Sequence, residues 1–150
     1  MLDRKLEKIK KVMDAARALL GTPYRYGAYA LTNRGAKPEG VDCSSFIQYV
    51  YKLAGVNLPR SSVLQATRGR AVKRARDLKA GDLVFFEGVQ GHYAHKLFRG
   101  RRVYIGHVAI YMGNGDIIHA RASKKRVAKQ KLSSLTKNPY FQIKLIKRIV

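Results

Sequence analysis

Two stretches of the chain carry apolar residues at the period of an α-helix. In the first, these positions recur at spacings of four and three: Leu2, Leu6, Ile9, Met13, Ala16 and Leu20. In the second, small and apolar residues share one helical face: Cys43, Phe46, Ile47, Val50, Tyr51 and Ala54. We predict an amphipathic helix over 1–20 that packs on the domain's own sheet, and a buried helix that begins at Cys43 and stops at Gly55. Asp42 occupies the N-cap position of the second helix.

Later in the chain the pattern changes to short apolar or alternating runs, which are typical of strands. We predict strands at 83–86, 107–112 and 117–120, and a last strand in which apolar and polar residues alternate over 141–145. The turn sequence Gly-Asn-Gly-Asp at 113–116 predicts a hairpin. Helices followed by antiparallel strands indicate the α+β class, with the N-terminal helices packed on an antiparallel sheet. No repeat or linker divides the chain, so we expect a single domain over 1–150.

The chain is strongly basic, with 31 Lys and Arg against 9 Asp and Glu and a formal net charge of +22. Such a charge indicates an anionic partner, which could be nucleic acid, a membrane surface or a cell-wall polymer. No zinc knuckle accompanies the charge, and the aromatic residues do not alternate with the basic ones, so nucleic-acid binding is not the expected main function. The basic runs 68–76 and 121–131 are predicted to be solvated connectors.

Two features bear on the membrane and on export. No apolar run approaches the roughly 20 residues of a membrane span, so we expect none. Met1–Lys11 is charged where a signal peptide would be apolar. Either the chain is not exported by that route, or a leader has been removed.

Cys43 is the only cysteine, which excludes an internal disulfide. Its predicted place in the first turn of a helix favours the thiolate, because the helix dipole and free N–H groups stabilise negative charge there. We therefore expect a lowered thiol pKa and a nucleophile. A buried structural thiol is the alternative for a lone cysteine.

His107 and His119 lie on the two strands of the predicted hairpin, so their side chains are expected to come close together. Packing of this sheet against the Cys43 helix would align a thiol with two imidazoles, as nucleophilic cysteine catalysis requires. One imidazole would move the proton, and the second would orient the first. Zinc binding by the same three residues is a rival, but no fourth ligand and no zinc signature accompany them. His92 and His95 fall in a long loop, 88–102, where they are either ordinary polar residues or part of a lid over the cleft.

Several motifs in order resemble the NlpC/p60 family of papain-like cysteine peptidases of bacterial cell walls. They are Gly21–Gly27, Asp42–Ser44, Leu58–Ser61, Gly81–Phe86, Gly106–Tyr111 and His119–Ala120. The resemblance implies a papain-like fold and an endopeptidase that cuts peptidoglycan stem peptides, typically between γ-D-glutamate and a diamino acid. It further implies an extracytoplasmic site of action in the periplasm, the cell wall or the medium. We expect a monomer that needs no metal or other cofactor.

The resemblance also assigns expected roles to individual residues. It implies Cys43 as the nucleophile, His107 as the base, His119 as the orienting residue and Tyr24 as a donor at the oxyanion site. Positions near the substrate cleft are implied for four more residues: Asp42, Ser44, Arg60 and Ser61.

The chain departs from the family pattern in a few places. Ser45 and Ala28 stand where the family usually has Gly, and we expect Ser45 to crowd the helix packing or the cleft floor. The loop over 88–102 is longer than usual, and the loop before Val41 is somewhat extended. These departures bear on substrate specificity. Two other hypotheses remain open: amide hydrolysis or acyl transfer on another substrate, and a non-catalytic module that binds cell wall or nucleic acid.

Overall fold

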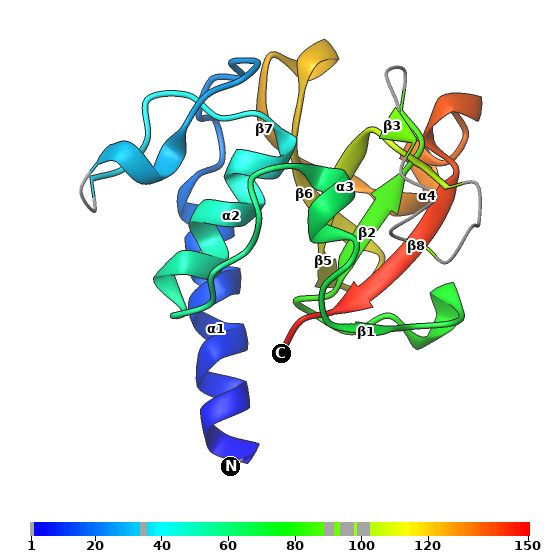
Figure 1. Cartoon of the computed structure of the whole chain (residues 1–150), viewed down its shortest axis with the longest axis horizontal. Helices are drawn as coiled ribbons and strands as arrows, with labels where there is room; N and C mark the ends of the chain where they lie inside the picture. The colour runs from blue at the N-terminus through cyan, green and yellow to red at the C-terminus, as the bar shows by residue number, and fades with distance from the viewer. Residues whose placement is uncertain (1, 34–35, 89–91, 94–97, 99–102) are drawn as a thin grey trace.

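A six-stranded antiparallel sheet forms one side of the molecule, and the two longest helices lie on the other side (Figure 1). The computed structural model describes residues 2–33, 36–88, 92–93, 98 and 103–150. The strand order in the sheet is β1-β8-β2-β5-β6-β7. This arrangement confirms the predicted α+β class with N-terminal helices on an antiparallel sheet.

The helix α1 (Leu2–Ala18) packs against α2 (Cys43–Leu53) through its second half only. Val12 and Ala16 are fully buried, whereas Leu2 and Leu6 are 70% and 55% exposed. In Figure 1 the first turns of α1, which carry the N-terminus, project beyond the sheet. The predicted helix is thus present, but its apolar stripe is buried over only half its length, and it packs chiefly on α2.

The helix α2 forms the centre of the core and begins where the sequence predicts. Phe46, Ile47 and Val50 are completely buried, and the Tyr51 hydroxyl donates to the carbonyl of Gly81 ahead of the first long strand. Because α2 contacts α1 on one side and β5 and β6 on the other, its first residue is held beside the sheet.

A reciprocal capping box starts α2. The Asp42 carboxylate accepts from the Ser45 N–H, and the Ser45 hydroxyl accepts from the Asp42 N–H, each at 2.9 Å. Ser45 is fully buried in this role. The expectation that Ser45 crowds the helix is therefore wrong, because its hydroxyl satisfies a backbone group that Gly would leave unpaired.

The predicted hairpin is β5 (His107–Gly113) and β6 (Asp116–Arg121), joined through Asn114, which has a positive φ of 54°. β2 (Leu83–Phe86) pairs with β5 and with β8 (Ile143–Arg148). The predicted last strand starts two residues later than expected, because Phe141 belongs to the short helix η5 (Pro139–Phe141).

The predicted connector over 121–131 is the main error in the fold. After η4 (Ala122–Lys124), Lys125 turns the chain with a φ of 60°, and residues Arg126–Lys131 form β7, paired along the whole of β6. Only Val127 of β7 is buried. A charged strand that buries one side chain gives little apolar alternation, and charged residues are common on edge strands.

The remaining elements are short. They are η1 (Ala30–Asn33), α3 (Ser62–Gln65), β1 (Arg70–Ala71), η2 (Ala75–Asp77), α4 (Leu132–Leu135), and the two-stranded pair β3 (His92–Tyr93) and β4 (Tyr104–Ile105). The basic run over 68–76 is largely exposed, as predicted. Among the described helices, none is long and apolar enough to cross a membrane.

Candidate active site

A cleft of about 810 Å³ opens where the start of α2 meets the sheet. One wall is formed by the loop before α2 and the turn before α3, and the other by the ends of β5 and β6 together with Asn138 and Phe141. Of the residues predicted for the site, all except His119 line this cleft: Tyr24, Asp42, Cys43, Ser44, Arg60, Ser61 and His107. His119 is completely buried directly behind His107.

Cys43 is the first residue of α2 and is only partly accessible. Burial, and then the negative charge of Asp42, raise the pKa of its thiol to about 11. The backbone N–H groups of Val108 and Ser44 act in the opposite direction but are outweighed. The predicted lowering of this pKa is wrong for the free protein, because the helix start stabilises the thiolate less than desolvation and Asp42 disfavour it.

His107 and His119 form a buried pair. Their facing nitrogens, Nε2 of His107 and Nδ1 of His119, are 2.7 Å apart. Burial, followed by the neighbouring His119 and Arg121, holds the pKa of His107 well below its usual value. Burial likewise lowers the pKa of His119 to about 4. Both rings are therefore neutral at neutral pH.

Gln130 of β7 determines which nitrogens carry protons in this pair. Its Oε1 lies 3.0 Å from Nε2 of His119. Because an amide oxygen can only accept, His119 carries its proton on Nε2, and its Nδ1 accepts from His107. His107 is then protonated on Nε2, which leaves its Nδ1 as the unprotonated nitrogen, the one suited to act as a base.

Aromatic rings hold His107 from two sides. The Phe141 ring lies at 5.3 Å between centroids and nearly perpendicular, and the Phe86 ring lies at 5.8 Å. With the hydrogen bond to His119, these contacts restrict the orientation of the imidazole. His107 is the first residue of β5, and its ring lines the cleft where this strand begins.

Asp42 and Arg60 form an ion pair on the wall of the cleft that faces His107. Arg60 donates to Asp42 at 2.8 Å, to the Ser44 hydroxyl at 2.8 Å and to the Ala28 carbonyl at 2.7 Å. Burial acts to raise the pKa of Asp42, but hydrogen bonds from Arg60 and the Ser45 N–H lower it overall. Asp42 thus stays ionised and ties three chain segments together.

Tyr24 and Ser61 lie in the cleft with different environments. Burial, then the nearby Cys43 and Asp42, raise the pKa of the Tyr24 phenol to about 12, so it remains a hydrogen-bond donor. The Ser61 hydroxyl accepts from the Leu64 N–H at 3.3 Å and caps α3.

Among the residues of this region that were not predicted from the sequence, three lie close to the two histidines: Gln130, Arg121 and Phe141. Gln130 and Arg121 fall in the segment that was expected to be a connector, so no pattern placed them near the histidines. Phe141 was assigned to a strand. Its place in η5 brings the ring against His107.

The two remaining histidines, His92 and His95, fall in the segment over 88–102. His92 lies in β3, and His95 falls outside the described residues, so the predicted lid over 88–102 stays a prediction. Within the part of the chain that the structure describes, no three His, Cys, Asp or Glu side chains converge in a way that could hold a metal ion.

The fold and the site together define a papain-like α+β domain, and comparison with known proteins agrees. The chain belongs to the NlpC/P60 family, whose sequence profile matches residues 21–149. This confirms the resemblance inferred from the motifs.

Individual relatives are similar in sequence to most of this chain. A probable endopeptidase of Corynebacterium glutamicum is 34% identical over 81% of this chain and 47% of its own length. A γ-D-glutamyl-L-lysine dipeptidyl-peptidase of Bacillus cereus is 33% identical over 77% of this chain and 29% of its own. The chain thus spans half or less of the length of these two relatives. The peptidoglycan hydrolase RipB of Mycobacterium tuberculosis has a similar structure, with a TM-score of 0.69 and 27% identity over 96% of this chain and 65% of RipB.

Proposed function

We propose that this protein is a cysteine endopeptidase that hydrolyses peptidoglycan stem peptides at the bond between γ-D-glutamate and a diamino acid. The observation that carries the proposal is the shared cleft of Cys43 and His107, with His107 Nε2 held by His119. The names of two relatives support the substrate, since one acts on a γ-D-glutamyl-L-lysine peptide and another is a peptidoglycan hydrolase.

Because the Cys43 thiol and the His107 imidazole are both neutral before the reaction, proton transfer accompanies the attack on the substrate. Nδ1 of His107 takes the Cys43 proton as the sulfur attacks the γ-carbonyl carbon of the substrate. In the proposed reaction, backbone N–H groups at the start of α2 and the Tyr24 hydroxyl stabilise the resulting oxyanion. His107 then gives the proton to the leaving amine, and a thioester forms. Water, deprotonated by the same nitrogen, hydrolyses the thioester and restores the thiol.

The basic surface fits an enzyme that works in a polyanionic wall. A positive surface raises the local concentration of the enzyme on such a substrate. We propose that anionic wall polymers are a second partner, that the protein acts as a single monomeric domain, and that it acts outside the cytoplasm.

The proposal is tested with purified sacculi and soluble muropeptides, using Cys43→Ala as the control and mass spectrometry of the products. We expect a fragment ending in γ-D-glutamate, formed by the wild type and lost in Cys43→Ala. His107→Ala should lose the same product while circular dichroism shows an unchanged fold.

Two results would overturn this function. Turnover that persists in Cys43→Ala would exclude the cysteine mechanism. Binding to sacculi without any Cys43-dependent product would favour a non-catalytic wall-binding module.

A further inference from the structure

The wall of the cleft beyond His107 carries a positive charge that no described residue balances. Arg121, the last residue of β6, lines the cleft with Ser123, Asn138 and Phe141. Its guanidinium lies over the Phe141 ring, 4.6 Å from the centroid. Nε of Arg121 is buried without a hydrogen-bond partner, and no ion pair or side-chain hydrogen bond joins the Arg121 guanidinium to any residue that the structure describes. A buried charged donor without a partner is costly, so such a group invites a ligand that accepts from it.

On the opposite wall of the cleft, the other arginine is fully paired. Arg60 is matched by Asp42 and by two further acceptors. Asp42 is also the only carboxylate among the described residues that line the cleft. Among the described residues that line it, the cleft therefore has a neutralised pair, Asp42 and Arg60, at one end and a single uncompensated cation, Arg121, at the other.

The reaction assigns each end of the cleft to a part of the substrate. His107 gives its proton to the leaving nitrogen, so the leaving group must lie on the His107 side of Cys43. From His107 the next side chain along that wall is Phe141, and the Arg121 guanidinium lies on the Phe141 ring. Arg121 is thus placed to meet a substituent of the leaving residue.

We propose that Arg121 binds a free carboxylate on the diamino acid that leaves, and so makes the enzyme selective for a diamino acid with a second carboxylate over lysine. Diaminopimelate carries this carboxylate, and lysine has only hydrogen there. A guanidinium binds a carboxylate through two parallel hydrogen bonds, which would include the unpaired Nε. The neutral side chains of Ser123 and Asn138 add donors on the same wall. This inference rests on the proposed function.

The first test compares kcat/KM for two soluble peptides, L-Ala-γ-D-Glu-diaminopimelate and L-Ala-γ-D-Glu-L-Lys. The wild type should prefer the diaminopimelate peptide at least tenfold, and Arg121→Gln should lower that ratio at least tenfold. Arg121→Lys, which keeps the charge but not the two-pronged geometry, should fall between them. Arg126→Gln is the matched control, since Arg126 lies opposite Arg121 in the β6–β7 register but does not line the cleft. A ratio that is unchanged in Arg121→Gln would overturn the inference.

A second measurement does not depend on turnover. In the Cys43→Ala background, calorimetry should show at least tenfold tighter binding of the diaminopimelate peptide, lost when that carboxylate is amidated or when Arg121 is replaced by Gln. Equal affinity for the two peptides would overturn the inference even if both are cleaved by the wild type. Cleavage of neither peptide by the wild type would overturn the proposed function instead, whatever the affinities show.

Discussion

At the scale of single residues, the base is defined by a chain of three side chains rather than by His107 alone. Gln130 accepts from His119, and His119 accepts from His107. Each contact fixes the tautomer of the next ring, so that His107 presents an unprotonated Nδ1. Gln130 does not line the cleft and acts through His119, which makes it a positioning residue.

Replacing Gln130 by Glu tests this arrangement. A carboxylate beside Nε2 should favour the imidazolium and raise the His119 pKa from about 4 towards its ordinary value. Protonated His119 cannot accept from His107, so activity should be lost at a higher pH than in the wild type. We expect the acidic limb of the pH profile of kcat/KM to move upward by about one unit or more.

Two further variants complete this test. Gln130→Leu, which removes the acceptor, should lower kcat about tenfold or more with little change in KM, consistent with the usual size of proton-transfer effects. Gln142→Glu makes the same substitution at an exposed site outside the cleft and should leave the profile unchanged. An acidic limb that does not move in Gln130→Glu would contradict the tautomer assignment.

At the scale of elements, the start of α2 joins stability to catalysis. The capping box satisfies backbone N–H groups, and the same Asp42 holds Arg60 and accepts from the Gly27 N–H at 3.1 Å. One carboxylate therefore sets the first turn of the helix that carries Cys43 and one wall of the cleft. This is why a family position usually filled by Gly can hold Ser45 here with a structural benefit.

Ser45→Gly should destabilise the protein by about 1–2 kcal/mol, because it removes the acceptor for the Asp42 N–H and places Gly in the first turn of a helix. Urea unfolding monitored by circular dichroism would measure this. Ser134→Gly, at an exposed position of the short helix α4, is the control and should cost less, since Ser134 makes no capping contact. A neutral or stabilising effect of Ser45→Gly would show that Ser45 strains the helix instead.

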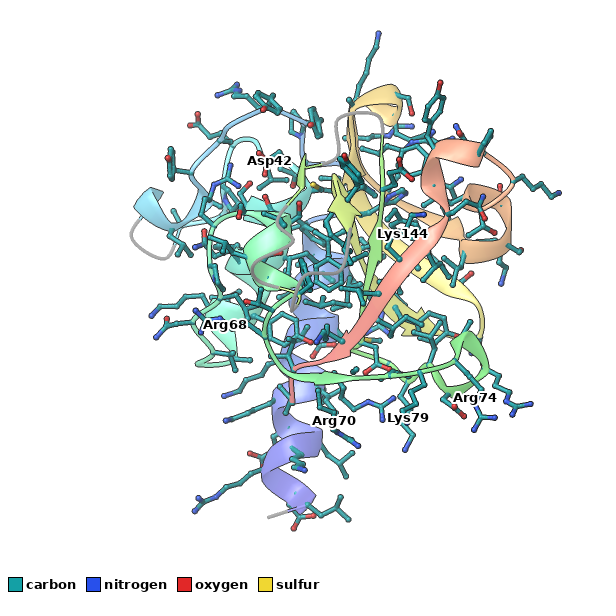
Figure 2. The ribbon with its side chains drawn as sticks, turned by 45° about the vertical axis from the view of Figure 1, so that its right-hand side comes forward. Asp42, Arg68, Arg70, Arg74, Lys79 and Lys144 are labelled. Carbon is teal, nitrogen blue, oxygen red and sulfur yellow. The ribbon has the colours of Figure 1, made fainter. Side chains whose placement is uncertain are left out.

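At the scale of the whole molecule, a strongly basic surface segment lies away from the cleft. The segment over 68–79 holds six Lys and Arg but one acid, Asp77, which pairs with Arg74. Figure 2 shows the labelled side chains of this segment along the lower part of the molecule, with Asp42 at the other end. A hollow of about 420 Å³ is lined by Arg70 and by three cations of α1, which are Arg4, Lys5 and Lys8. It shares no lining residue with the cleft. This basic end could hold a polymer while the cleft stays open.

A variant with four neutralised cations of this segment (Arg68, Arg70, Lys73 and Arg76, each to Gln) should bind sacculi more weakly. Its binding should also depend less on salt, because exposed charges are screened within roughly 10 Å at 0.1 M salt. We expect kcat/KM on soluble muropeptides to stay at the wild-type level. Sedimentation with sacculi across a salt series would measure the binding.

The control for this experiment removes the same charge elsewhere. Four cations that each pair with a carboxylate are replaced by Gln: Lys10, Arg17, Lys129 and Lys131. If both variants lose binding equally, net charge and not the basic end attracts the wall.

The elements that depend on local physics could be predicted from the order of the residues alone. The helical period and N-cap placed Cys43 at the start of α2, and the Gly-Asn-Gly turn brought His107 and His119 onto neighbouring strands. Both signals depend on residues within a few positions of each other, so the chain displays them directly.

The features that depend on distant neighbours became visible only in the packed molecule. The strand β7 buries a single side chain and pairs through its backbone, so its sequence looks like a solvated connector. With β7 unassigned, Gln130 could not be placed on His119. The pKa of Cys43 followed the same rule: the helix start predicted a lowered value, but burial against the sheet and the Asp42 charge raised it to about 11, because desolvation is a property of the packed molecule and not of the helix.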